Sequence, residues 1–186
     1  GILMNWNIPG TVLQLPRQEA DRIETHFSAL FLAGGLSLSQ VTGITGLEPY
    51  TVQNWVKRGF LSGPKNKRYS LDQLCRIINI NMLKSVLPME RIVGLLSYIN
   101  GDLDDESDDM IDDSQLYFMF VRLAAQANAM NTPAGRDECI ARELAGYREP
   151  VPGAKMRVEK VLRIMLTAWA SALLRQTAEQ MLQELG

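Results

Sequence analysis

Residues 37–61 read SLSQVTGITGLEPYTVQNWVKRGFL and carry the signals for two short helices joined by a tight turn. Ser37 and Gln40 have capping-box spacing, in which each side chain satisfies a free backbone N–H group at the start of a helix. The glycine-containing run 43–46 ends that helix quickly. Pro49 suits the first helical position because it has no N–H to leave unpaired, and Gly59 ends the second helix. The stretch therefore predicts a helix, a turn and a helix over 49–58.

The second predicted helix is amphipathic. Val52, Trp55 and Val56 recur at the spacing of one inward face, and we expect Trp55 to be the central core residue of this region. The remaining positions are expected to point outward, and they are Tyr50, Thr51, Gln53, Asn54, Lys57 and Arg58.

A basic, turn-rich segment follows, over residues 62–68, and lies between the apolar pair at 60–61 and Tyr69. Its cations are Lys65, Lys67 and Arg68. A small two-stranded wing would have this composition if residues 65–69 lay along a phosphate backbone. A second capping box, Ser70 with Gln73, begins another helix, and Pro88 precedes a further helix over 89–99. This order of elements is typical of a winged helix-turn-helix, which makes double-stranded DNA the leading candidate partner.

The same residues resemble the MerR-like DNA-binding domain over about a third of the chain. The resemblance lies in the runs 41–46, 49–52, 57–61, 68–70 and 87–92 and in Trp55. It implies that helix 50–58 is the recognition helix, that Arg68-Tyr69 belong to the wing, and that the protein regulates transcription in bacteria. The chain is also similar to an uncharacterised bacterial family, domain of unknown function 1836, whose name implies no activity.

Two departures from the MerR-like pattern leave the target sequence open. The recognition helix of that family commonly carries an arginine, two aromatic residues and an acid where this chain has 53–56, QNWV. Glu48 also replaces the serine that usually caps the helix. The family's base contacts are therefore not carried over. Gln53 and Asn54 are instead expected to read adenine, because each amide can pair bidentately with that base.

Charge is unevenly distributed along a chain whose net charge is −2. Residues 50–91 hold eight basic and two acidic side chains, whereas residues 102–113 hold eight acidic side chains and no basic one. The basic stretch matches the expected DNA-facing surface. We interpret 101–113 as a solvated acidic linker rather than a calcium loop or a mimic of DNA phosphates, and it lacks the central glycine of an EF-hand loop. Its polar surroundings are not expected to raise a carboxyl pKa, which argues against catalysis there.

The rest of the chain is expected to be helical. Residues 1–36 contain an amphipathic helix over about 17–32, with Ile23, Phe27, Leu30 and Phe31 on one face, expected to pack on the C-terminal half. Residues 114–186 predict helices over 114–130, 139–144 and 154–185, with a break at 132–135. The fold class is therefore mainly α: a MerR-like winged helix-turn-helix over 37–100 with a small wing, and a C-terminal helical bundle.

The C-terminal half is expected to have one of three roles. It forms a homodimer, binds a small-molecule or protein effector, or enlarges the hydrophobic core. The apolar residues of the last helix do not follow a sustained heptad, but they lie on more than one side, at Leu162, Ile164, Leu166, Trp169 and Leu173. One neighbour within the chain does not cover them all, which favours a second copy. On this interpretation, residues 1–100 would fold alone as a monomer.

Other classes of function have little support. Cys75 and Cys139 have no metal-ligand spacing and are interpreted as core thiols, His26 is the only histidine, and no phosphate loop or catalytic triad is present. We therefore expect no enzyme activity, metal or cofactor. No window has the length of apolar sequence that a membrane span needs, which predicts a cytoplasmic protein. The predicted function is a DNA-binding transcription regulator, and the alternative is a winged-helix adaptor that binds proteins without DNA.

Overall fold

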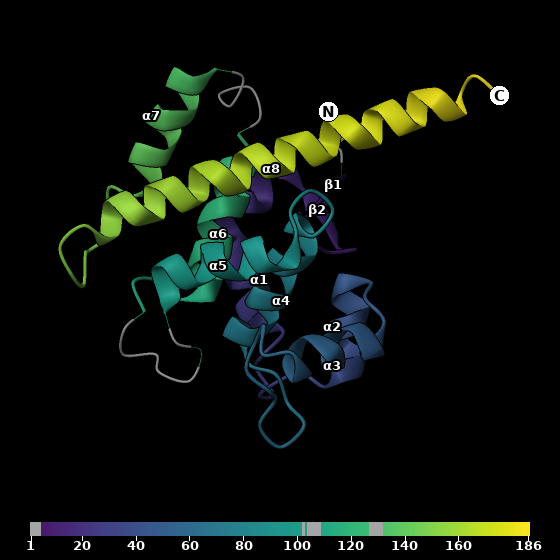
Figure 1. The fold of residues 1–186 in the computed structure, drawn as a ribbon, viewed down its shortest axis with the longest axis vertical. Coiled ribbons are helices and arrows are strands. Elements are labelled where there is room, and N and C mark those ends of the chain that lie inside the picture. The colour runs from purple at the N-terminus through teal and green to yellow at the C-terminus, as the bar shows by residue number, and fades with distance from the viewer. Residues whose placement is uncertain (1–4, 102, 104–108, 127–131) are drawn as a thin grey trace.

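The computed structural model describes residues 5–101, 103, 109–126 and 132–186, which form a mainly helical fold (Figure 1). Two short antiparallel strands, β1 (Asn5–Asn7) and β2 (Gln14–Pro16), pair near the N-terminus, and a 3-10 helix, η1 (Arg17–Arg22), follows them. The α-helices are α1 (Ile23–Ala29), α2 (Leu38–Thr45), α3 (Pro49–Lys57), α4 (Leu71–Leu83), α5 (Met89–Asn100), α6 (Asp113–Ala124), α7 (Pro133–Glu143) and α8 (Ala154–Gln183).

Local capping interactions place the ends of α2 and α4 where the sequence predicts them. The Ser37 hydroxyl accepts a hydrogen bond from Gln40 N at 3.2 Å, and Gln40 Oε1 accepts one from Ser37 N at 2.9 Å. Ser70 and Gln73 make the same pair of bonds at 3.1 and 2.8 Å. Gly46 ends α2 with φ +73°, a left-handed conformation that glycine adopts without a Cβ clash. Both capping boxes are confirmed.

Helix α4 lies at the centre of the molecule. All residues from Leu74 to Ile80 are buried, because α6 packs along the helix and α2, α5 and α8 cover its other sides. Buried apolar side chains from Ile8 to Ala168 form one continuous cluster. The elements of the first and second halves of the chain therefore share a single core.

The N-terminal segment differs from the predicted helix over 17–32. It forms the β1–β2 hairpin, then η1, then an α-helix that ends at Ala29, and Leu30 is exposed. Two contacts with α4, both at Gly10, hold the turn of the hairpin in place. Gly10, with φ +76°, lies so close to α4 that a Cβ atom would be 2.7 Å from Ile78, and Asn81 Nδ2 donates to Gly10 O at 3.0 Å. Phe27 of α1 packs on the rings of Tyr117 and Phe118 in α6.

Two helix boundaries in the second half also need correction. Residues 132–135, predicted to break a helix, instead begin α7: the Thr132 hydroxyl caps it by accepting from Gly135 N at 3.0 Å, and Pro133 is its first residue. Helix α6 begins at Asp113, one residue before the predicted start. The predicted end of that helix at 127–130 lies outside the described residues.

Helix α8 crosses one end of the molecule, and its C-terminal part extends beyond the other helices (Figure 1). Helices α2 and α3 lie at the opposite end in the same view. No helix in the part of the chain that the structure describes is both long enough and apolar enough to cross a membrane.

Candidate nucleic-acid interface

Helices α2 and α3 are joined by residues 46–48, and α3 packs through its apolar face as predicted. Val52 is fully buried and Trp55 is only 5% exposed. The Lys84 ammonium group lies 5.9 Å from the centre of the Trp55 ring. These contacts confirm Trp55 as a core residue and hold α3 with its opposite face toward solvent.

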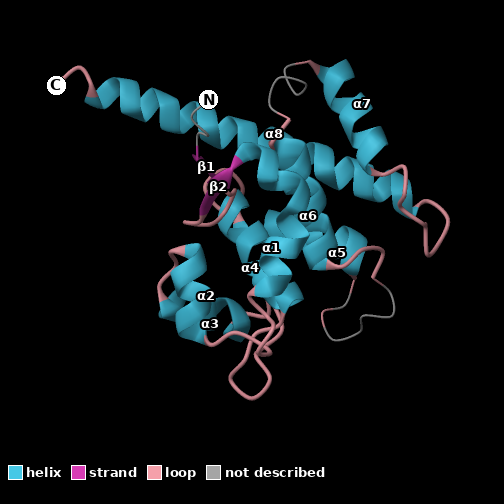
Figure 2. Cartoon of the chain, turned by 180° about the vertical axis from the view of Figure 1, so that it is seen from behind, coloured by secondary structure: helices cyan, strands magenta, loops and turns pink. Residues whose placement is uncertain are grey.

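Residues 62–69, here called the basic loop, form a tight hairpin after α3. Lys65 and Arg68 exchange two backbone hydrogen bonds of 3.0 and 2.9 Å, and Asn66 and Lys67 between them have φ values of 50° and 60°. Tyr69 exchanges two further backbone bonds with Leu36, at 2.9 and 2.7 Å. Figure 2 shows the segment as loop rather than strand, projecting at the same end of the molecule as α3. The basic loop is therefore anchored at its base and open at its tip.

Most of the side chains predicted to face DNA are at the surface. Tyr50 is 74% exposed, and Thr51 and Asn54 are half-buried. The exposed remainder consists of Gln53, Lys57, Arg58, Lys65, Lys67 and Arg68. Tyr69 is the exception, because it is 3% exposed and its burial raises the pKa of its phenol. Tyr69 is thus a core residue at the base of the basic loop, unlike the other residues that the sequence predicts to contact DNA.

The exposed side chains make few contacts within the chain. Arg58 stacks on the Phe60 ring, 4.6 Å from its centre. Most of the predicted DNA-facing side chains form no hydrogen bond or ion pair with any residue that the structure describes. They are Tyr50, Gln53, Asn54, Lys57, Lys65, Lys67 and Arg68. Their donors and charges are therefore available to an external ligand.

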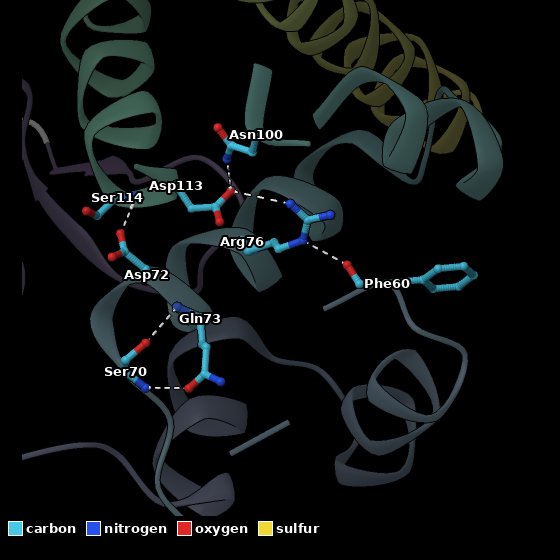
Figure 3. Close-up of polar contacts among 8 residues, drawn as sticks. All are labelled: Phe60, Ser70, Asp72, Gln73, Arg76, Asn100, Asp113 and Ser114. Carbon is cyan, nitrogen blue, oxygen red and sulfur yellow. Dashed lines mark hydrogen bonds and ion pairs between the residues drawn. The ribbon is translucent and has the colours of Figure 1, made fainter. Parts of the chain in front are cut away.

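A polar network holds the segment after α3 and the start of the basic loop against α4, and Figure 3 shows its contacts at Phe60, Arg76, Asp113, Asp72 and Ser114. Arg76 Nε donates to the carbonyl oxygen of Phe60 at 2.8 Å, and Gln73 Nε2 donates to that of Gly63 at 2.7 Å. Arg76 Nη1 also lies 3.6 Å from Asp113 Oδ1. A contact between the first turns of α4 and α6 lies beside this pair, where the Asp72 carboxylate accepts from Ser114 N at 3.0 Å.

Burial changes the electrostatics of this network. Desolvation raises the pKa of Asp113 from 3.8 to about 7, although the Arg76 guanidinium opposes the rise. Desolvation also lowers the pKa of Arg76. Asp113 is therefore not part of a solvated linker, and the expectation that no carboxyl in this run has a raised pKa was wrong. Arg76 is one of the eight basic residues counted in 50–91, but it is buried and therefore adds little to the surface charge.

Sequence reasoning did not assign Asp72, Gln73, Arg76 or Asp113 a role in positioning α3. One signal was present: Arg76 stands between apolar neighbours that all lie on a buried helix, and buried arginines need partners. The identity of the partner depends on how α6 packs on α4. No local pattern in the sequence indicates that packing.

The C-terminal half contains a cavity of about 450 Å³ between α6 and the α7–α8 connection. Its lining includes Met119, Tyr147 and the ion pair of Arg122 with Glu143. Trp169 of α8 packs edge-to-face on Phe120 of α6, with the ring centres 5.9 Å apart. Cys75 and Cys139 are both buried, as expected for core thiols.

Comparison with known proteins finds a distant relative and a family model that matches part of the chain. Uncharacterized protein YkrK of Bacillus subtilis (strain 168) is 26% identical over 106 residues, which cover 55% of this chain and 46% of that protein. The chain thus aligns with about half the length of this relative. No solved structure matches the chain. Residues 33–120, from before α2 into α6, match the model of a family described as Domain of unknown function (DUF1836).

Proposed function

We propose that this chain is a MerR-like DNA-binding transcription regulator, in which α2, α3 and the basic loop act as a winged helix-turn-helix. In this proposal α3 enters the major groove, and Tyr50, Gln53, Asn54 and Lys57 face the bases and the adjoining backbone. The basic loop is the wing, and its cations contact phosphates.

The arrangement of α3 supports the proposal most directly. Its apolar face is buried through Val52 and Trp55, while amide and cationic side chains on the other face have no partner among the described residues. A helix that presents such a face at one end of a molecule has the shape and chemistry required by the groove. A helix that is merely solvated needs only charged side chains on its outer face. Such a helix gains nothing from lying beside a cationic hairpin, whereas a helix that enters a DNA groove does.

The positioning network gives the second line of support. Arg76 is bonded to the carbonyl of Phe60, two residues beyond Arg58 at the end of α3, and Gln73 is bonded to the base of the basic loop. Both anchors come from α4, which is buried along most of its length. The two elements are therefore held on one rigid support, as a reader of adjacent groove and backbone requires.

Binding to a random duplex DNA, measured by fluorescence anisotropy at increasing salt, tests this function. We expect binding at low salt that weakens as salt increases, because each phosphate contact releases counterions. The double variant Lys57→Ala, Lys67→Ala should bind more weakly. The matched control Arg148→Ala, Lys160→Ala removes two exposed cations that lie outside α3 and the basic loop, and should bind like the wild type.

Two outcomes would contradict the proposal. Absence of wild-type binding at low salt would favour a protein-binding adaptor that uses the same surface. An equal loss of affinity in both double variants would show that binding reflects overall charge rather than this face of the molecule.

A further inference from the structure

Three helices meet at a polar cluster below the surface, which we call the Asp113 cluster. It consists of Arg76 from α4, Asn100 at the end of α5 and Asp113 at the start of α6 (Figure 3). Arg76 is 3% exposed and Asn100 is 5% exposed. Asp113 Oδ1 accepts a hydrogen bond from Asn100 Nδ2 at 3.3 Å and lies 3.6 Å from Arg76 Nη1. One carboxylate oxygen therefore serves both an amide and a guanidinium group.

The amide of Asn100 is well partnered on one side only. Its oxygen points toward the carbonyl oxygens of Ile99 and Ile111, and acceptors that face one another repel. A half-turn of the amide exchanges its oxygen and its nitrogen. Nδ2 then donates to the Ile111 carbonyl at 2.6 Å and to the Ile99 carbonyl at 3.1 Å. Asn100 thus has two orientations, and each gives it a different set of partners.

The turned orientation of Asn100 requires a proton on Asp113. After the half-turn, the amide oxygen of Asn100 faces Asp113 Oδ1 across the distance that the nitrogen spanned before. An ionised carboxylate can only accept, so the two oxygens repel, whereas a protonated carboxyl has an O–H group that donates to the amide oxygen. Protonated Asp113 therefore favours the turned amide, and ionised Asp113 favours the orientation in Figure 3.

We propose that the Asp113 cluster is a proton-operated switch, in which protonation of Asp113 turns the Asn100 amide toward Ile111 and releases Arg76 Nη1 from its ion pair. Loss of the proton restores the ion pair and turns the amide back. This switch goes beyond the proposed function, because it operates within the chain and requires no DNA.

The charges around Asp113 place the switch in the neutral pH range. Burial raises the pKa of Asp113 to about 7, and the Arg76 guanidinium opposes this rise. The carboxylates of Asp72 on α4, and of Asp109 and Asp112 on the segment before α6, raise the pKa further. Helix α5 faces Asp113 with an uncharged amide. The carboxyl therefore gains or loses its proton near neutral pH, as a switch at physiological pH requires.

Arg76 connects the switch to the segment that follows α3. Its Nε donates to the Phe60 carbonyl at 2.8 Å, and its Nη2 has no partner in the part of the chain that the structure describes. Contacts with Phe60 and Asp113 therefore fix the guanidinium, and protonation of Asp113 leaves only the first. Phe60 N also donates to the Trp55 carbonyl at 2.9 Å, so a change at Arg76 reaches the last turn of α3.

An NMR titration of the full chain from about pH 5 to pH 9 tests the switch without DNA. The signals are the carboxyl carbon of Asp113, the side-chain amide of Asn100 and the backbone N–H of Leu61, which adjoins the Phe60 carbonyl. We expect all three to shift with one midpoint near pH 7. An Asp113 signal that does not titrate in this range would overturn the proposal. A titrating Asp113 whose proton leaves Asn100 or Leu61 unmoved would overturn it too.

Two variants assign the titration to its group. Asp113→Asn should abolish the shifts at Asn100 and Leu61. The matched control Asp137→Asn removes an exposed carboxylate that also pairs with an arginine, Arg163, at 3.0 Å, and it should leave the shifts as in the wild type. The only histidine of the chain titrates in a similar range. Shifts at Asn100 and Leu61 that persist in Asp113→Asn would therefore belong to another group and reject the switch.

Discussion

At the scale of single residues, Gln53 and Asn54 are the side chains of α3 best suited to read bases. Each has an amide that can accept and donate to adenine in the major groove, and neither side-chain amide forms a hydrogen bond within the part of the chain that the structure describes. Replacing either with Ala should relax the preference at one or two base pairs by about 1–3 kcal/mol. Competition between a selected site and random DNA measures this effect. Equal losses on both DNAs would show that the residue does not read bases.

A second residue-scale prediction concerns Asp113 and pH. Its pKa is raised from 3.8 to about 7 in the folded protein, so between these values the folded protein binds this proton more tightly than the unfolded chain does. The contribution of Asp113 to the free energy of unfolding is therefore largest at low pH, falls as pH rises to about 7, and then levels off. Urea unfolding at several pH values should show this decline, and Asp113→Asn should flatten it. An equal slope in the variant would mean that another group titrates.

At the scale of elements, the basic loop is expected to position the protein rather than to read sequence. Lys65, Lys67 and Arg68 lie on a hairpin whose tip is exposed, so they can neutralise phosphates of any sequence. Replacing all three with Ala should weaken binding to every duplex and lower the salt dependence by about 0.9 for each lost contact. Anisotropy titrations over a range of salt concentrations give the slope. An unchanged slope would place the basic loop away from DNA.

At the scale of the whole molecule, the continuous core predicts that the first hundred residues do not fold alone. Helix α4 packs along α6, Tyr117 donates to the carbonyl of Pro9 at 2.6 Å, and Phe27 needs the α6 rings. A chain cut after Asn100 would expose these apolar faces, contrary to the monomer expected from sequence. Circular dichroism should show no cooperative thermal transition for it. A chain cut after Ala172 loses only exposed residues and should melt like the full chain, and a cooperative transition in the shorter chain would contradict the prediction.

The elements foreseen from sequence are those controlled by neighbours a few residues away. Capping boxes at Ser37 and Ser70, the glycine at 46 and the proline at 49 act within one helical turn, so the bounds of α2, α3 and α4 and the outward face of α3 could be predicted. The N-terminal hairpin, the burial of Tyr69 and the Arg76–Asp113 pair could not. Each of these depends on contacts between residues far apart in the chain, because burial is set by which helices pack together and periodicity alone does not name the partner.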